Sequence, residues 1–141
     1  MILVKKLTDT AILPTRAHPG DAGLDLYADE SVTLGPGEHR LISTGISIAL
    51  DSWRVGLVCP RSGLALHEKV TVLNAPGVVD SSYRGCVGVL LINHGNQPFI
   101  VKRKMRIAQL LVMDTMTESL LEVVTLPPSG RDTQGFGSSG H

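Results

Sequence analysis

Residues 46–59, Ile-Ser-Ile-Ala-Leu-Asp-Ser-Trp-Arg-Val-Gly-Leu-Val-Cys, carry the pattern that decides the fold. Apolar residues alternate with small or polar ones from Ile46 to Leu50, and again from Trp53 to Cys59. Because successive side chains of a strand point to opposite faces, a period of two predicts strands with one buried face. The stretch therefore predicts two half-buried strands.

Short apolar runs separated by turn residues continue over most of the chain. Clusters of Gly, Pro, Asn and Asp mark turns at residues 35–37, 75–77 and 93–98. Many short strands without a long amphipathic helix predict an all-β fold, a distorted jelly-roll barrel or sandwich with one short helix. We find no repeat and no second domain. Further strands are expected at residues 70–73, 87–92, 99–101, 107–113 and 120–126.

Composition limits the classes of protein to consider. With 141 residues, 43% of them apolar and 18% charged, the chain has the size of one domain with a proper core. The formal net charge of zero argues against attraction of the whole protein to nucleic acid or to a membrane surface. The basic run at residues 102–106 could form a local nucleic-acid patch, but a solvated turn beside a strand explains it as well.

The two cysteines and the start of the chain bear on location. Cys59 and Cys86 lie in apolar runs and suggest no disulfide framework, so we expect reduced thiols in a cytoplasmic protein. Residues 1–6 hold too short an apolar stretch for a signal peptide, and no apolar run approaches the ~18 residues of a membrane span. We therefore expect no membrane association.

A short helix is expected after the strand that ends near Pro60. Ser62 can act as an N-cap for residues 63–69. Such a helix start presents free backbone amides beside the Arg61 guanidinium, and both groups favour an anion. A capping serine is also a common structural feature, so the sequence leaves both interpretations open.

The C-terminal segment, residues 127–141, has the composition of a closing lid. It contains one large apolar residue, Phe136, among four glycines and two prolines. It cannot bury enough surface to offset the entropy of its own ordering, so we expect a mobile arm after a β domain of residues 1–126. Its Arg131 charge, hydroxyls, free amides and aromatic ring suit an anionic ligand with a flat ring, such as a nucleotide.

Three further segments place polar residues where a site would need them. Asp25 lies on the polar face of an alternating strand, where a solvated acid is the simpler interpretation. Asp80 lies in an apparent hairpin, either as a turn residue or as a general base with Tyr83 as an aromatic wall. Gln109 interrupts an apolar strand, and its amide needs partners that either neighbouring groups or a ligand must supply.

Taken in order, five segments of the chain resemble the five motifs of the trimeric deoxyuridine triphosphate nucleotidohydrolases, the dUTPases. These segments span residues 22–140: Ala22-Gly23-Leu24-Asp25-Leu26, Pro60-Arg61-Ser62-Gly63, the segment from Gly77 to Tyr83-Arg84-Gly85, Arg106-Ile107-Ala108-Gln109-Leu110, and the arm. The resemblance implies hydrolysis of dUTP to dUMP and pyrophosphate by Mg²⁺-assisted in-line attack of water on the α-phosphate. Such an activity keeps dUTP low and supplies dUMP for thymidylate synthesis. It also implies a homotrimer in which one chain supplies motifs one, two and four to each site, a second the base and a third the arm.

The resemblance assigns roles to the candidate residues around the nucleoside. Asp80 corresponds to the general base that activates the water. Tyr83 corresponds to the residue that packs on the deoxyribose and leaves no room for a 2′-hydroxyl. Main-chain groups of the same hairpin, including those of Gly77 and Val79, would read uracil, with Asn74 contributing.

The remaining candidates would surround the triphosphate and close the site. The residues that would bind phosphate are Arg61, Ser62, Gly63 and Gln109, with Arg131, Gly137, Ser138 and Ser139 from the arm. Phe136 would stack on the uracil. Asp25 would lie near the water shell of Mg²⁺, which phosphate oxygens and waters chiefly hold.

Departures from the family pattern are few, and two other functions stay open. Gln134 stands where the arm usually has glycine, Cys86 where an acidic or amide residue is frequent, and Lys69 where glycine is common. One alternative is a dCTP deaminase-like enzyme, but the hairpin offers no glutamate for that chemistry. The other is a nucleotide-binding regulator that also binds a protein partner.

Overall fold

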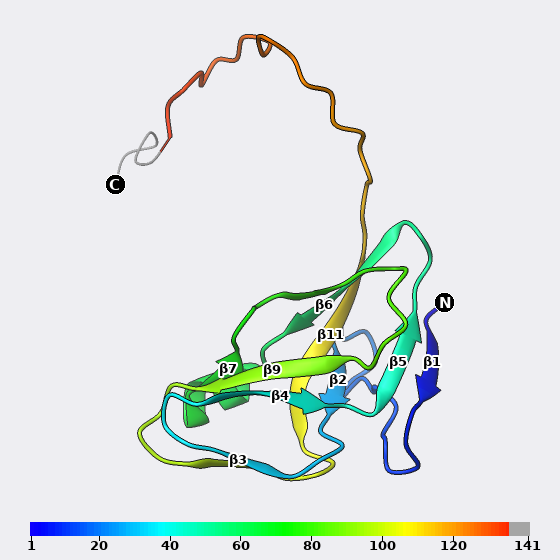
Figure 1. Ribbon diagram of the computed structural model, residues 1–141, viewed down its shortest axis with the longest axis vertical. Coiled ribbons are helices and arrows are strands. Elements are labelled where there is room, and N and C mark those ends of the chain that lie inside the picture. Colours follow the sequence, from blue (N-terminus) through cyan, green and yellow to red (C-terminus); the bar gives the residue numbers. More distant parts are fainter. Residues whose placement is uncertain (136–141) are drawn as a thin grey trace.

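Eleven strands and one short helix make up residues 1–135, the part of the chain that the computed structural model describes. Figure 1 shows the strands gathered at one end of the molecule and the C-terminal segment leading away from them. The elements are β1 (Leu3–Lys6), β2 (Leu24–Tyr27), β3 (Val32–Leu34), β4 (His39–Ser43), β5 (Ile46–Ala49), β6 (Arg54–Cys59), η1 (Leu64–Glu68), β7 (Val70–Val72), β8 (Gly77–Val79), β9 (Gly88–Asn93), β10 (Phe99–Val101) and β11 (Arg106–Asp114).

The strands pair antiparallel, and mostly with partners distant in the sequence. The largest sheet has the order β2-β11-β6-β8, a second has the order β4-β9-β7, and β1-β5 and β10-β3 form two-stranded sheets. The two strands expected within residues 46–59 are confirmed, although they do not pair with each other. Instead β5 pairs with β1, and β6 pairs with β11 and β8. Consecutive strands thus lie in different sheets, as in the jelly-roll arrangement that the sequence predicts.

Alternating burial along the strands produces the core between the sheets. In β9 every second residue is buried, and Leu91 is fully enclosed. Leu26 of β2, Ile46 of β5 and Leu110 of β11 contribute side chains with no solvent exposure. The period of two therefore gives both the strands and their inward face, as expected.

The helix after β6 forms, but it differs from the expectation in type and in its cap. It is a single π-helical turn over Leu64–Glu68, and no side chain caps its N-terminus. Ser62 is already helical, so it cannot serve as the N-cap that the sequence suggested. Lys69 ends the turn at φ 57°, the left-handed conformation that explains why glycine is common there. No helix within residues 1–135 is long and apolar enough to cross a membrane.

The prediction of a strand at residues 120–126 is wrong, because these residues form no strand in the single chain. The last strand ends at Asp114, and the amide of Thr115 donates to the carbonyl of Trp53 at 2.7 Å. From residue 116 to residue 135 every residue is exposed, and Figure 1 shows this segment running away from the sheets. An apolar run becomes a strand only beside another strand edge, and this segment meets none.

A buried carboxylate fastens the N-terminal loop to the end of β2. Asp29 is 8% exposed, and its two oxygens accept hydrogen bonds of 2.6 Å from the hydroxyls of Thr8 and Thr10. Gly45 lies against this carboxylate at φ 65°, where a β-carbon would come within 2.6 Å of Asp29 Oδ2. The hydrogen bonds from Thr10 and Thr8 lower the pKa of Asp29; burial opposes the shift and the Arg103 charge adds to it.

We predict that this carboxylate makes the fold sensitive to acid. Because the pKa of Asp29 is lower in the folded than in the unfolded chain, its contribution to stability is present above the ordinary carboxyl pKa and is lost as the pH falls through the folded value. The wild-type protein should therefore exceed Asp29→Asn in unfolding free energy at pH 6, and the difference should narrow toward pH 3. Urea unfolding at both pH values measures it, and a difference independent of pH would contradict the assignment.

Candidate active site

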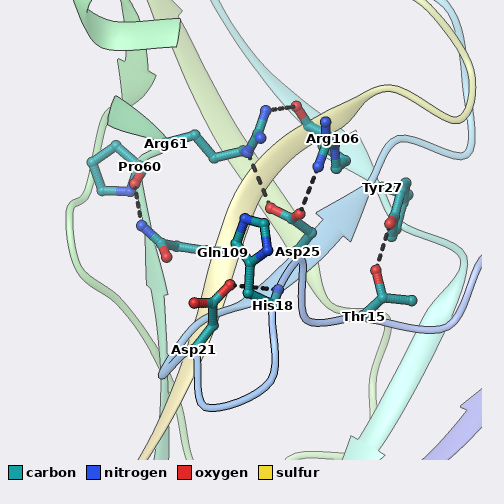
Figure 2. Close-up of polar contacts among 9 residues, drawn as sticks. All are labelled: Thr15, His18, Asp21, Asp25, Tyr27, Pro60, Arg61, Arg106 and Gln109. Atoms are coloured by element: carbon teal, nitrogen blue, oxygen red, sulfur yellow. Dashed lines mark hydrogen bonds and ion pairs between the residues drawn. The ribbon is translucent and has the colours of Figure 1, made fainter. Parts of the chain in front are cut away.

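A pocket of about 330 Å³ brings together five of the residues selected from the sequence. It opens where β2, the loop after β6 and β11 meet, as Figure 2 shows from the polar contacts at this point. The selected residues in its wall are Asp25, Arg61, Ser62, Gly63 and Gln109, and Ala17, Asp21, Ala22 and Gly23 complete the lining. We call this the Arg61 pocket.

Asp25, in the lining of this pocket, holds two guanidinium groups. Its Oδ1 accepts from Arg61 Nε at 3.0 Å, and its Oδ2 accepts from Arg106 Nη1 at 3.2 Å (Figure 2). Arg61 Nη1 also donates to the backbone carbonyl of Arg106 at 3.2 Å. Two guanidinium groups thus share one carboxylate, and Arg61 brings its charge into the lining of the pocket. The N–H groups that Arg61 does not use here are free to meet an anion.

The side chain of Gln109 is held by the residue that follows β6. Its Nε2 donates to the carbonyl of Pro60 at 2.9 Å, so a neighbouring group satisfies part of the amide (Figure 2). Its Oε1 lies against Gly23, where a β-carbon would overlap that oxygen. Gly23 is therefore needed for close approach, and the remaining polar atoms of the amide face a pocket that a ligand can enter.

A second pocket, of about 250 Å³, contains the other central candidates. Its walls come from β8, from the segment before β9 and from β4, and we call it the Asp80 pocket. Asp80, Tyr83 and Val79 line it, together with Leu41, Val78, Cys86, Val87 and Gly88. One carboxylate and one phenol thus face a mainly apolar surface, which suits a flat, uncharged part of a ligand.

The segment that carries Asp80 is a loop, and the hairpin interpretation is wrong. A hairpin would pair β8 with β9, but β8 pairs with β6, while β9 pairs with β4 and β7. Within the loop the Tyr83 hydroxyl donates to the carbonyl of Cys86 at 3.0 Å. Gly85 permits this fold because a β-carbon there would overlap the Tyr83 phenol.

The other candidates lie outside these two pockets. Asn74 approaches Gly77, where its Nδ2 would be 3.3 Å from an added β-carbon. Arg131 donates within its own segment, to the carbonyls of Gln134 at 2.9 Å and Gly135 at 3.4 Å. The arm candidates Phe136, Gly137, Ser138 and Ser139 lie outside the described residues. The two pockets share no lining residue, so one chain keeps the selected residues in separate places.

Sequence reasoning missed several residues that build the pockets. Arg106 lies in a selected segment, but it was attributed to a solvated basic turn. In the structure it binds Asp25, and Arg103 of the same run donates to the carbonyl of Asp29 at 2.9 Å. Leu41 and Asp21 carried no signal, because their roles come from contacts between distant segments.

The donor set also bears on metal binding. Within residues 1–135 no three His, Cys, Asp or Glu side chains are grouped to hold a metal ion. The Arg61 pocket offers the carboxylates of Asp21 and Asp25, and the arginines use one position on each Asp25 oxygen. A hard cation such as Mg²⁺ fits this site only if ligand oxygens and waters supply most of its coordination.

Comparison with known proteins agrees with this geometry. The family model described as dUTPase matches residues 9–140. The chain is 49% identical over 137 residues to the deoxyuridine 5′-triphosphate nucleotidohydrolase of Trichodesmium erythraeum, covering 97% of this chain and 96% of that protein. It is 51% identical over 137 residues to the protein of the same name from Clostridioides difficile, with the same coverage.

Solved structures agree as well. The dUTPase of Staphylococcus bacteriophage 80alpha with dUpNHpp superimposes with a TM-score of 0.93 at 27% identity, covering 100% of this chain and 99% of that one. A dUTPase from phage phi11 of S. aureus, described with a structural Mg(II) ion, gives a TM-score of 0.85 at 23% identity, covering 91% and 99%. The chain belongs to the dUTPase family, the deoxyuridine 5′-triphosphate nucleotidohydrolases.

Proposed function

We propose that this protein hydrolyses dUTP to dUMP and pyrophosphate, by in-line attack of water on the α-phosphorus. The observation that carries the proposal is the Arg61 pocket, in which Asp25 orients the Arg61 guanidinium toward a space that can take a phosphate group. Electrostatic stabilisation of this kind is usually the largest contribution to phosphoryl-transfer catalysis. The nucleotide-binding members of the family support the choice of ligand.

The Asp80 pocket supplies the groups for the nucleoside and the water. Asp80 is the only carboxylate in its lining, and it is exposed enough to reach a water molecule. We assign it as the general base that takes a proton from that water. Tyr83 covers the deoxyribose, while main-chain groups of Gly77 and Val79, with Asn74, read the uracil.

Arg61, Ser62, Gly63 and Gln109 bind the phosphates and hold the leaving pyrophosphate in line with the attacking water. Mg²⁺, when bound with the substrate, neutralises phosphate charge and polarises the α-phosphorus. Each Asp25 oxygen that accepts from an arginine keeps a second lone-pair position, and that position can accept from a water of the metal's shell. The donors present therefore fit a metal held mainly by the substrate.

In a homotrimer, candidate residues that lie in separate places in one chain would meet in one active site. Residues 116–126, which lead to the arm, expose a run of apolar side chains, among which Leu120 and Val124 are fully accessible. β1 pairs only with β5 among residues 1–135, so its other edge is open to a strand. We propose that residues 1–126 form the β domain and that residues 127–141 close over a neighbouring site. Arg131, Gly137, Ser138 and Ser139 would then contact phosphate, and Phe136 the uracil.

The free thiols Cys59 and Cys86 support a cytoplasmic setting.

The substrate assignment predicts a selectivity series. Pyrophosphate release should be fast with dUTP and slower by about 10²-fold or more with UTP, dTTP and dCTP, because each of these leaves a steric or polar mismatch in the nucleoside pocket. A pyrophosphate assay with all four nucleotides tests this. Ammonia release from dCTP would instead support the deaminase, and tight nucleotide binding without pyrophosphate release would support the regulator.

Substitution of the base separates binding from chemistry. Asp80→Asn should lower kcat by about 10²-fold or more and leave the Kd for a non-hydrolysable dUTP analogue within a few fold, because only proton transfer is lost. Steady-state kinetics and calorimetric titration measure the two quantities. Near-normal turnover would reject Asp80 as the base.

Removal of residues 128–141 tests the arm. The truncated protein should keep its unfolding midpoint, since residues 116–135 are exposed in the chain. It should also keep its oligomeric state, since the apolar run at residues 120–126 remains. Turnover of dUTP should nevertheless fall by about 10²-fold or more, because phosphate contacts and closure are lost. Light scattering and the pyrophosphate assay distinguish these effects, and full activity after truncation would contradict closure by the arm.

A further inference from the structure

The loop that carries Asp80 has no strand ladder to hold it. Residues 80–87 connect β8 and β9, which belong to different sheets. The one backbone hydrogen bond inside the loop runs from the Tyr83 amide to the Asp80 carbonyl at 3.0 Å. Something else must therefore fix the direction of the Asp80 side chain, because catalysis by a base requires its position to within a fraction of an ångström.

Hydroxyl groups of the β4–β5 segment supply that support. Ser47 Oγ donates to the carbonyl of Arg84 at 2.7 Å, and Thr44 Oγ1 donates to the carbonyl of Val87. The amide of Val87 donates to the Ile46 carbonyl at 2.8 Å. The second half of the loop is thus attached to a wall of the barrel through the side chains and backbone of one short segment.

Ser47 is buried because of this attachment. The period of two places it on the face of β5 opposite to Ile46 and Ile48, yet its exposure is only 6%. The loop lies over it, and its hydroxyl has the Arg84 carbonyl as a partner. A polar group enclosed in this way is costly unless it makes such a bond, so the contact is specific.

Arg84 carries the restraint to the first half of the loop. Its Nη1 donates to the carbonyls of Ser81 at 2.6 Å and Tyr83 at 2.8 Å. The guanidinium therefore ties together the residues that directly follow Asp80. A continuous series of hydrogen bonds leads from β5 through Ser47 and Arg84 to the turn that begins at the Asp80 carbonyl.

We infer that Ser47 and Arg84 are positioning residues for Asp80, acting without contact to the substrate themselves. Loss of the Ser47 hydroxyl releases the Arg84 carbonyl, and the loop then samples orientations in which the carboxylate misses the water. This inference rests on the proposed function, because it takes Asp80 as the base. Its effect should appear in kcat, since the phosphate groups bind to the separate Arg61 pocket.

The test compares Ser47→Ala with Ser47→Thr, which keeps the hydroxyl. Ser47→Ala should lower kcat about 10-fold and leave KM within about twofold, while Ser47→Thr should stay close to wild type. Hydrogen exchange of the amides at residues 81–87 should accelerate in Ser47→Ala alone. Ile42→Val, a substitution of a fully buried β4 residue, is the matched control: it should lower the unfolding midpoint without changing kcat.

A double-mutant cycle with Asp80→Asn isolates the positioning role. If Ser47 acts through Asp80, Ser47→Ala should cause no further loss of turnover in the Asp80→Asn protein. An equal loss in both backgrounds, or normal kcat in a folded Ser47→Ala protein, would overturn the inference. If Ser47→Ala does not fold, Arg84→Met tests the other link of the series, because it removes the guanidinium hydrogen bonds to the carbonyls of Ser81 and Tyr83. Normal turnover of Asp80→Asn alone would instead refute the proposed base, and the exchange data would still report whether Ser47 restrains the loop.

Discussion

The two ion pairs of Asp25 are the interaction on which the rest of the site depends. β2 joins its sheet only through β11, and the carboxylate on β2 reaches Arg106 on β11 and Arg61 in the loop after β6. The side chain of Asp25 is 12% exposed, while those of Arg61 and Arg106 are 27% and 47% exposed, so water screens the two ion pairs only in part. Three segments distant in the sequence are therefore held in one arrangement, and the same contacts that hold them turn the Arg61 guanidinium toward the pocket.

The two pockets are built in different ways, in keeping with what each must do. In the Arg61 pocket, Asp25 on β2 already pairs with Arg61 before a ligand arrives, which suits electrostatic stabilisation. The Asp80 pocket uses a loop beside the ends of β8 and β9. A loop allows the Asp80 carboxylate to be exposed, but it needs restraints from Ser47 and Arg84 that a strand ladder would otherwise provide.

The sequence predicts the strands well because burial in this fold follows a period of two. Residues 99–101 match β10, and residues 107–113 lie within β11. Pairing could not be predicted, since the partners of β5 and β6 are set by contacts over long distances in the chain. For the same reason Asp25 and Gln109 were selected by type and place, whereas Arg106 was not: its role exists only once β11 lies beside β2. The prediction of Ser62 as the N-cap was wrong because the helical segment already includes Ser62.

The apolar segment at residues 120–126, which does not form the predicted strand, bears on the oligomeric assembly. The apolar pattern there is as clear as that of β10, yet Leu120, Leu121 and Val124 remain exposed. Exposed apolar groups of this size favour burial, at roughly 25 cal/mol for each Å² removed from water. Figure 1 shows the segment that leads to Arg131 running away from the strands, and Arg131 lines neither pocket. In the proposed homotrimer, a second copy that offers an open strand edge would cover this apolar run and place Arg131 near a neighbouring site.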